Sequence, residues 1–289
     1  MKKSIRLLLT AIISISLPML FLTGCGSSDS KASGTTSTKT EASTTVSTTT
    51  QPTSAPASTK DENSAINKND TGKTVIRTLS TDKTYTNTCY MIISKNGTVA
   101  VADPYAVAPG VKSDIITSTH AHPDHIDSVF DLTATGKKSY YTVENFEVKD
   151  MKVSSIASSH LGDTINKDTP DNIIYVYEVD GLRIAHMGDI GQTKLTDEQM
   201  KALGKIDIAI MQFDNSYSDY SLTNGNGFKL IEQLKPQIII PSHSSDATTD
   251  EIAKIVGAKE VVDDIYTVSK DDLKDGKRKV IVIKDNLAK

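Results

Sequence analysis

The sequence predicts an α/β domain with mixed β-sheets and helices outside the sheets. Between residues 73 and 284, short apolar runs alternate with segments that have helical periodicity. The pairs Asn96-Gly97 and Asp180-Gly181 each stand between two apolar runs, as the tight turn of a hairpin requires. Later runs are instead followed by helical segments. Hairpins together with strand–helix units indicate mixed sheets covered by helices.

The expected strands are short runs rich in β-branched and other apolar residues. They cover residues 74–79, 88–94, 98–103, 114–118, 152–159, 173–179, 182–187, 207–213, 237–243 and 279–284. Cys89 belongs to the second run, and we expect it to be a buried structural cysteine because its neighbours are apolar.

Four helices are expected between the strands, at residues 126–136, 196–204, 227–235 and 248–257. Gly136 is the predicted end of the first helix, since glycine often follows the last helical turn. Thr196 and Gln199 have the spacing of a capping box at the start of the second. Thr248 and Glu251 have the same spacing and predict the start of the fourth.

The N-terminus has the pattern of a secretory signal peptide, residues 1–24. A basic start is followed by the apolar run Leu7–Leu22, which is shorter than the roughly 20 residues of a bilayer-spanning helix. The run ends in L-T-G-C, Leu22 to Cys25, which resembles a bacterial lipobox. The resemblance implies lipidation of Cys25 and a domain held at the outer, extracytoplasmic face of the bacterial membrane. The alternative is an uncleaved anchor followed by an ordinary cysteine.

Residues 25–72 are expected to form a disordered linker. Between Gly26 and Lys60, twenty of thirty-five residues are Ser or Thr, and Val46 is the only large aliphatic residue. Such a segment cannot bury enough apolar surface to offset the entropy of ordering it. We therefore assign the folded domain to residues 73–289, with a flexible spacer between it and the membrane.

The charge balance excludes one class of partner. Cleavage before Cys25 removes three basic residues and no acid, which takes the formal net charge from −4 to −7. Non-specific nucleic-acid binding depends on clustered Lys and Arg, so we expect no nucleic-acid partner. With Cys25 acylated, we expect no internal disulfide, because the sequence has only two cysteines.

Half of the six histidines lie in the stretch T-H-A-H-P-D-H, residues 119–125. His120, His160 and His243 each directly follow an expected strand, and Asp189 follows another. Strand ends let a rigid sheet present side chains from distant sequence positions to one cavity. Imidazole and carboxylate are typical ligands of zinc and neighbouring transition metals. The spacing H-x-H-x-D-H offers two ligand sets from one loop, which favours two adjacent metal ions with Asp189 well placed to bridge them.

The chain resembles the metallo-β-lactamase superfamily. The resemblance rests on T-H-A-H-P-D-H at 119–125, S-S-H at 158–160, H-M-G-D at 186–189 and P-S-H at 241–243. V-A-D-P-Y at 101–105 and L-K-P-Q-I-I-I-P-S-H further resemble the branch that includes L-ascorbate-6-phosphate lactonase-like proteins. The resemblance implies a four-layer αβ/βα sandwich with the site along one edge.

The resemblance also implies a ligand set. It gives the first metal His120, His122 and His160, the second metal Asp124, His125 and His243, and a bridging role to Asp189. Two divalent ions, Zn²⁺ first with Mn²⁺ or Fe²⁺ as alternatives, would supply a hydroxide that attacks a carbonyl carbon or a phosphorus atom. Asp124 is the candidate catalytic residue, because it could orient that hydroxide or accept its proton. The expected substrate is a small ester, lactone, phosphodiester or amide, with a β-lactam ranked lower.

We also consider two alternatives to the hydrolase function. A surface binding lipoprotein could keep the metals without turnover, although the presence of both Asp124 and Asp189 argues against a degenerate site. A redox di-iron site is less favoured, since such relatives usually have an acidic residue where this chain has His122.

Three features outside the ligand set stay open. His186 is better explained as a hydrogen-bonded histidine near the sheet edge than as a catalytic group. Asp163 is either a partner of His160 or a turn residue. The segment 214–227 departs from the glycine-containing loop of the family branch, and its polar residues either line a substrate pocket or form a surface loop.

Overall fold

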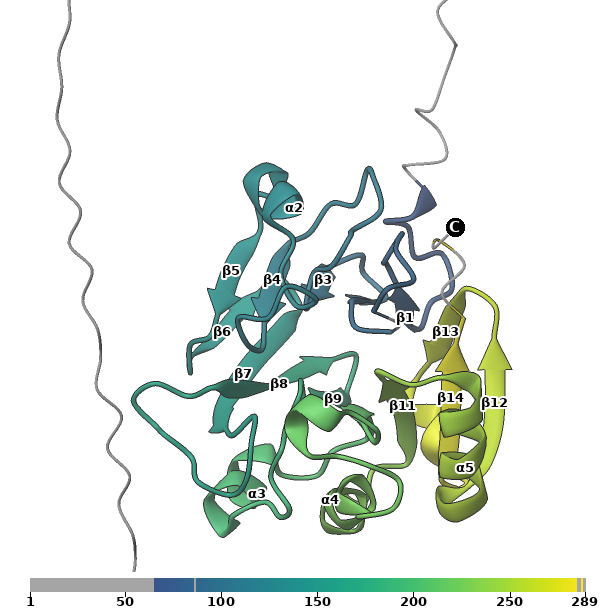
Figure 1. Cartoon of the computed structure of the whole chain (residues 1–289). Coiled ribbons are helices and arrows are strands. Elements are labelled where there is room, and N and C mark those ends of the chain that lie inside the picture. The colour runs from purple at the N-terminus through teal and green to yellow at the C-terminus, as the bar shows by residue number, and fades with distance from the viewer. Residues whose placement is uncertain (1–64, 86, 285–286, 288–289) are drawn as a thin grey trace, which may run out of the picture. The chain divides into compact units, whose positions relative to one another are not determined.

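The computed structural model describes residues 65–85, 87–284 and 287. The predicted signal peptide, Cys25 and most of the predicted linker lie outside these residues. Two mixed sheets form the domain, in agreement with the predicted fold class (Figure 1). Within the described residues, no helix has both the length and the apolar character needed to cross a bilayer.

The first sheet has six strands in the order β13-β1-β2-β3-β4-β5. Its members are β1 (Thr74–Thr78), β2 (Tyr90–Ile93), β3 (Val99–Ala102), β4 (Ile115–Ser118), β5 (Lys137–Tyr140) and β13 (Ile265–Val268). Strands β13 to β3 pair antiparallel, whereas β3, β4 and β5 pair parallel. The Asn96-Gly97 turn joins β2 to β3, as predicted.

The second sheet has eight strands in the order β12-β14-β11-β10-β9-β8-β7-β6. Its members are β6 (Asn145–Val148), β7 (Met151–Ser158), β8 (Asn172–Val179), β9 (Leu182–His186), β10 (Ile208–Gln212), β11 (Ile238–Ser242), β12 (Ala258–Val262) and β14 (Lys279–Ile283). Strands β6 to β9 are antiparallel, and the rest are parallel. Asp180 and Gly181, both at positive φ, form the predicted turn between β8 and β9.

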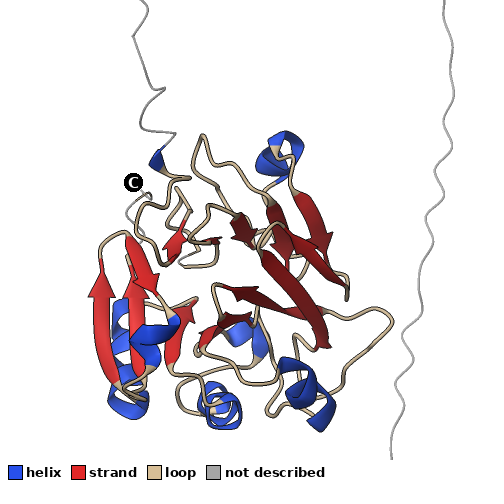
Figure 2. Ribbon diagram, turned by 180° about the vertical axis from the view of Figure 1, so that it is seen from behind, coloured by secondary structure: helices blue, strands red, loops and turns tan. Residues whose placement is uncertain are grey.

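Helices α2 to α5 of the described residues lie on the outside of the sheets (Figure 2). They are α2 (Ser128–Thr133), α3 (Asp197–Leu203), α4 (Asn226–Leu234) and α5 (Asp246–Val256), accompanied by the 3₁₀ turns η1 (Ser216–Ser218) and η2 (Lys270–Leu273). The Thr196–Gln199 capping box of α3 is present as predicted.

Successive side chains along a strand pack into different apolar layers on the two faces of the sheet. Ile115 of β4 lies in the core between the two sheets, where it joins residues such as Tyr175 and Ile210. The next residue, Ile116, points to the other face and packs with Phe130 of α2. The outer face of the second sheet packs against α3, α4 and α5. This alternation is the two-residue period of a strand, and it fixes which face each strand presents.

Two predicted helix ends were wrong. The first helix ends at Thr133 rather than at Gly136, because Ala134 is already extended. Gly136 is needed for another reason, since a Cβ there would lie 2.7 Å from the backbone of Asp114. The last helix begins after Ser245, whose hydroxyl accepts a hydrogen bond from the Thr248 backbone at 3.2 Å. Thr248 is therefore inside the helix and not its cap.

Four of the strands were not predicted from the sequence. These four, β5, β6, β12 and β13, are the edge strands of the two sheets, and each alternates exposed or half-exposed residues with few buried apolar ones. Contacts also begin upstream of the predicted boundary at residue 73. Ile66 packs on the outer face of the first sheet, and the Asn69 amide donates to the Ser94 carbonyl at 2.9 Å. Cys89 is buried as expected.

Candidate metal centre

The second sheet brings several of the predicted residues to one edge. Because β7, β9, β10 and β11 run in the same direction, their C-terminal ends lie side by side. His160 follows β7, Asp189 follows β9 and His243 follows β11. His243 has a φ of +48°, a left-handed conformation that is strained for a residue with a side chain. Such strain is concentrated at functional sites, where the surrounding structure holds it in place.

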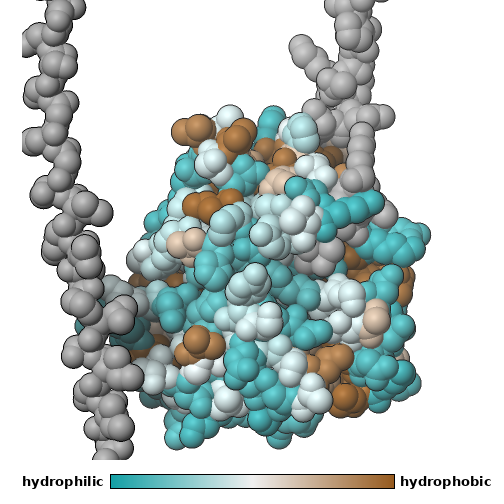
Figure 3. Space-filling view, in the orientation of Figure 1, coloured by the Kyte–Doolittle hydropathy of each residue, from teal (hydrophilic) through white to brown (hydrophobic). Residues whose placement is uncertain are grey.

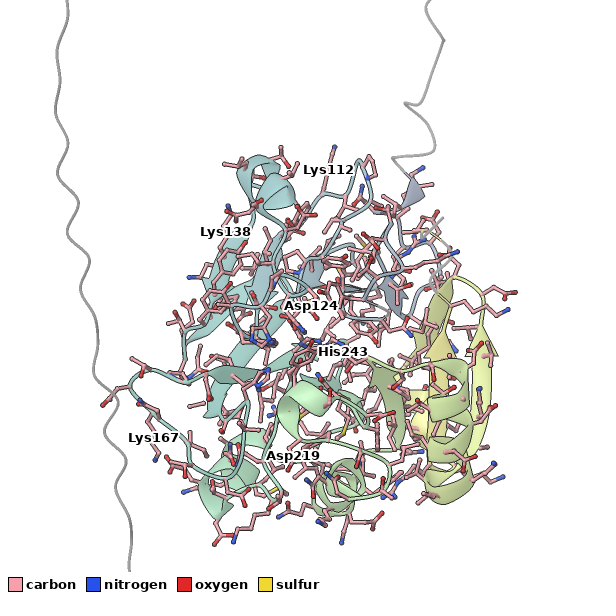
Figure 4. All side chains as sticks on the ribbon, in the orientation of Figure 1. Lys112, Asp124, Lys138, Lys167, Asp219 and His243 are labelled. Carbon is pink, nitrogen blue, oxygen red and sulfur yellow. The ribbon has the colours of Figure 1, made fainter. Side chains whose placement is uncertain are left out.

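The loop 119–125 supplies the remaining histidines from the end of β4. The Ser118 hydroxyl donates to the His125 carbonyl at 2.7 Å and lies 3.2 Å from the His120 carbonyl. The His125 backbone N–H donates to the His122 carbonyl at 3.0 Å. These bonds curl the loop, so that its side chains face the edge of the second sheet. Figure 4 shows Asp124 from this loop and His243 from β11 close together in the middle of the molecule.

Four of the predicted residues form what we call the first ligand group: His120, His122, His160 and Asp189. One ligand atom from each lies within 4.8 Å of all the others. The His120 Nε2 is 3.0 Å from the His122 Nδ1. The Asp189 Oδ2 is 3.8 Å from the Nε2 atoms of both His120 and His160.

The other three form the second ligand group: Asp124, His125 and His243. The Nε2 atoms of His125 and His243 are 3.2 Å apart. The Asp124 Oδ2 lies 3.4 Å from the His125 Nε2 and 3.9 Å from the His243 Nε2.

Asp189 stands between the two groups. Its Oδ2 faces the first group, and its Oδ1 lies 3.0 Å from the His243 Nε2 and 3.5 Å from the His125 Nε2 in the second. Burial acts to raise the pKa of Asp189, but the surrounding histidines, His243 first, hold it well below its usual value. An ionised carboxylate with one oxygen toward each ligand group is what a bridging ligand requires.

The residues fit divalent metal ions. The set of five imidazoles and two carboxylates suits zinc and its neighbours. The buried His160 Nε2 has no hydrogen-bond partner among the described residues. Burial, with help from His125, lowers the pKa of His120 to about 3, so this imidazole is neutral and keeps a lone pair for a cation. The structure thus brings all seven predicted ligand positions together, while their role as ligands stays a prediction.

Residues 83–243 match the model of the beta-lactamase superfamily domain, which is more than half of the 289-residue chain. The chain belongs to this superfamily. The predicted membership is therefore confirmed.

Relatives of this metallo-β-lactamase superfamily member include two curated archaeal proteins. A UPF0173 metal-dependent hydrolase of Thermococcus onnurineus is 28% identical over 175 residues, which are 52% of this chain and 77% of that protein. Another of Pyrococcus furiosus is 25% identical over 172 residues, which are 50% of this chain and 75% of that protein.

Among solved structures, one from Thermotoga maritima is assigned to the Zn-dependent hydrolases of the metallo-β-lactamase superfamily. It has a TM-score of 0.53 and 22% identity, covering 73% of this chain and 98% of that one. This likeness confirms the fold. Family, fold and relatives together make this chain a metal-dependent hydrolase of the metallo-β-lactamase fold.

Asp103 is a residue of this hydrolase that sequence reasoning did not place in the site. It directly follows β3, is fully buried, and has a φ of +48°. Its carboxylate accepts bonds at 2.7 Å from the Thr119 N–H and hydroxyl, and its Oδ2 lies 2.7 Å from the His125 Nδ1. A carboxylate behind a ligating histidine fixes the orientation of the ring and leaves the other nitrogen for the metal. The V-A-D-P-Y motif, used only as a mark of resemblance, was the available signal.

Asp103 also sets the charge of the second ligand group. Burial opposes protonation of His125, but the Asp103 carboxylate outweighs it and raises the pKa of His125 to about 10. Burial likewise acts against ionisation of Asp103, yet His186 and His125 hold the pKa of this carboxyl below its usual value. The two side chains therefore form a buried ion pair before a metal binds, with the His125 Nδ1 toward Asp103.

Two asparagines hold Asp189 in place. The Asn215 amide donates to the Asp189 Oδ2 at 2.8 Å and lies 2.7 Å from the Gln212 Oε1 at the end of β10. The Asn172 side chain accepts from the Asp189 N–H at 3.1 Å and donates to the Met187 carbonyl at 3.0 Å. Asn215 was expected either in a pocket or in a plain surface loop, and the structure favours the pocket.

The motif H-M-G-D-I-G needs both of its glycines. Gly188 has a φ of +57°, and a Cβ there would lie 2.7 Å from the Thr119 side chain. A Cβ on Gly191 would lie only 2.1 Å from the His160 carbonyl oxygen. The Gly191 N–H donates to the Ser159 carbonyl at 2.8 Å. The two glycines therefore let the segment after β9 lie directly against the loops that carry His120 and His160.

The structure also shows the surroundings of His186 and Asp163, whose roles were left open in the sequence analysis. His186 is buried at the end of β9, with its Nδ1 3.7 Å from the Asp103 Oδ2. That nitrogen has no hydrogen-bond partner among the described residues, so the expected hydrogen bond is missing at this atom. Asp163 accepts from the Thr193 N–H and hydroxyl, at 2.7 and 2.6 Å, and so acts within a turn. The His160 N–H instead donates to Asp171 at 3.0 Å.

Two cavities open over the ligand groups and meet at His122. The first cavity, about 540 Å³, reaches the second ligand group and is walled by the segment after β10. Its lining includes Tyr85, Asp214, Asn215 and Tyr217. The second cavity, about 520 Å³, lies over the first ligand group beside Tyr141 and Asp171. The middle of the face drawn in Figure 3 is mostly hydrophilic.

Proposed function

We propose that this superfamily member is a two-metal hydrolase of small-molecule esters, lactones, phosphodiesters or amides, held at the outer face of a bacterial membrane by a lipid on Cys25. The observation that carries the two-metal proposal is the position of Asp189, whose two carboxylate oxygens face different ligand groups. Zn²⁺ is the first ion to test, because imidazole and carboxylate suit it, and Mn²⁺ and Fe²⁺ are alternatives.

The chemistry that such ions supply when bound is the acidification of a water to a pKa near 7 and the stabilisation of a developing oxyanion. The residues of the chain position these events. Asp124 lines the first cavity beside Asp189, where its carboxylate can orient the attacking water or take its proton. Burial works against ionisation of Asp124, but His125 and His243 hold its pKa below the usual value, so a proton acceptor is ready at neutral pH.

The rival proposal is a binding lipoprotein that keeps metals without turnover. Both carboxylates of the site are in place and ionised, and open cavities adjoin each ligand group, which favours turnover. Chelation separates the two. In a hydrolase, chelation abolishes turnover, whereas in a binding module it only lowers the melting temperature.

The direct experiment is elemental analysis of the full-length chain beside its His122→Ala variant, followed by a screen with an aryl ester, a lactone, an aryl phosphodiester and an amide. We expect two transition-metal ions per chain, a loss of metal in the variant, and metal-dependent turnover of at least one substrate. The hydrolase proposal fails if the chain retains no metal and cannot be reconstituted with zinc, manganese or iron.

The anchoring part of the proposal is tested separately. The full-length chain expressed in a bacterium should incorporate labelled fatty acid and fractionate with membranes, and a Cys25→Ala variant should do neither. A Cys89→Ala variant is the matched control, because Cys89 is the only other cysteine in the sequence and lies in the buried core. Labelling that survives Cys25→Ala would contradict the proposed lipid site.

A further inference from the structure

We propose that the first cavity selects substrates by charge, with Asp214, Tyr85 and Tyr217 forming a seat for a cationic group on the non-reacting part of the substrate. This inference rests on the proposed function, because the ligand groups would take the scissile bond. The cavity walls would then contact the rest of the substrate. The part of the molecule that sets substrate class is therefore the wall of the cavity and not the ligand set.

Histidines are the basic side chains that line the two cavities within the described residues. None of the described residues that line either cavity is Lys or Arg. Lys112, Lys138 and Lys167, labelled in Figure 4, lie at the margins of the molecule, far from Asp124 and His243 in that view. A pendant phosphate or carboxylate on a substrate normally meets Arg, Lys or a cluster of N–H donors. A substrate with a pendant anion would therefore meet no Lys or Arg among the described residues that line the two cavities.

The first cavity instead presents a carboxylate outside the ligand groups. Asp214 is exposed, lines the cavity and makes no ion pair within the described residues, whereas many other surface acids are paired with lysines. The second cavity likewise has Asp171, which accepts a hydrogen bond from the His160 backbone. An unpaired carboxylate in the cavity attracts a substrate cation at about 1 kcal/mol when it lies roughly 4 Å away in water, which is about a fivefold effect.

Two tyrosines supply aromatic surfaces to the same cavity. Tyr217 sits on η1 with 80% of its surface exposed, and Tyr85 is also exposed. Tyr85 packs edge-on against Tyr105, with ring centroids 5.3 Å apart, so its ring has a defined orientation. The faces of tyrosine rings attract ammonium and quaternary ammonium groups. Exposed aromatic rings beside an unpaired carboxylate are suited to binding a cationic group.

Asn215 connects the seat to the metal centre through hydrogen bonds. This residue stands between Asp214 and Tyr217, its amide donates to the Asp189 Oδ2, and its Oδ1 accepts from the Tyr217 N–H at 3.0 Å. Asn215 also pairs with Tyr220 across the loop, in bonds of 2.9 and 3.0 Å. The loop therefore holds the seat at a fixed separation from the scissile bond, as substrate positioning requires.

The test compares three thioacetates that share a two-carbon link from sulfur and differ in the charge of the terminal group: acetylthiocholine, its neutral isostere S-(3,3-dimethylbutyl) thioacetate, and the anionic S-acetyl-2-mercaptoethanesulfonate. The full-length chain loaded with Zn²⁺ is assayed by thiol release. We expect kcat/KM to fall from the cationic to the neutral to the anionic thioester. Asp214→Asn should lower the ratio of cationic to neutral turnover about fivefold, and Asp214→Lys should reverse the order of the cationic and anionic substrates.

Asp70→Asn is the matched control, because Asp70 is exposed, forms no ion pair with a described residue and lines neither cavity. It removes the same charge and should leave all three rates unchanged. Equal kcat/KM values for the three thioesters, or a ratio that Asp214→Asn leaves unchanged, would overturn the seat while the hydrolase proposal stands.

A binding measurement separates the two proposals. The ketone 5-(trimethylammonio)pentan-2-one and its neutral isostere 6,6-dimethylheptan-2-one cannot be hydrolysed, and calorimetry reports their affinity without turnover. If neither the thioesters nor any substrate of the ester, lactone, phosphodiester and amide screen is cleaved, but the cationic ketone binds more tightly and depends on Asp214, the hydrolase proposal fails and the seat stands. If neither ketone is preferred, the seat is wrong whether or not hydrolysis occurs.

Discussion

The two ligand groups of the metal centre differ in how firmly they are held. In the second group, the buried Asp103 fixes the ring of His125 from behind, and the strained backbone of His243 sets its direction. In the first group, His122 is exposed, and the buried Nε2 of His160 has no hydrogen-bond partner among the described residues. We infer that the second group is preorganised for a metal ion, whereas the first would be completed by the ion itself. We therefore expect the first group to release its ion more readily.

The largest effect should come from the residue that the two groups share. Asp189→Ala removes an oxygen from each group and should lower metal content toward zero, with a fall in kcat/KM of at least about a hundredfold. Elemental analysis and a rate assay on the full-length chain measure both quantities. Asp271→Asn removes an exposed acid remote from the cavities and should change neither. A variant that kept two ions would contradict the bridging role.

Asp103→Asn should weaken metal binding to the second ligand group and leave metal binding to the first group almost unchanged. The substitution keeps an acceptor for Thr119 but removes the charge behind His125, so affinity for one ion should fall about 10- to 100-fold and affinity for the other should change little. A competition titration with a chromogenic chelator resolves the two affinities. Asp150→Asn is matched, since Asp150 is also a multiply hydrogen-bonded carboxylate but lies outside the site. Equal weakening of both ions would remove the distinction between the groups.

Gly191→Ala should act on the first group through the backbone. The new Cβ would lie 2.1 Å from the His160 carbonyl oxygen, so the loop that carries His160 must shift. We expect destabilisation of about 1–3 kcal/mol, measured by denaturant unfolding of the full-length chain, together with loss of the more weakly held ion. Gly162→Ala meets no atom within 4 Å and strains only its own φ, so it should leave metal content intact. Equal behaviour of the two variants would contradict the contact.

The smallest expected effect is on the number of protons that the two ligand groups release at pH 7 when metal ions bind. Asp103 raises the pKa of His125 to about 10, so His125 is protonated before the metal binds and must give up its Nε2 proton. His120, with its pKa lowered to about 3 by burial, has no proton to give. Calorimetry in buffers of different ionisation enthalpy should show about one proton released when the second group fills and none from His120. The release should disappear in Asp103→Asn.

The sequence predicted the cluster because the loop 119–125, His160, Asp189 and His243 all come shortly after strands, and strand ends are visible as apolar runs that stop at a polar residue. His160, Asp189 and His243 met at one edge because parallel strands carry their ends together. The roles of Asp103 and Asn215 could not be predicted, since each depends on a contact between segments distant in sequence. Strand β12 was missed because A-K-E-V-V has neither an apolar run nor a strict alternation.

Asp189 is the residue that we propose joins the two groups into one dinuclear centre. Its most direct test is electron paramagnetic resonance of the full-length chain reconstituted with Mn²⁺, because two manganese ions bridged by a carboxylate about 3.5–4 Å apart are magnetically coupled. We expect two ions per chain and the signal of a coupled pair, and we expect Asp189→Ala to lose this signal together with the bound ions. A single ion per chain, or two ions that show no coupling in the unmodified protein, would contradict it.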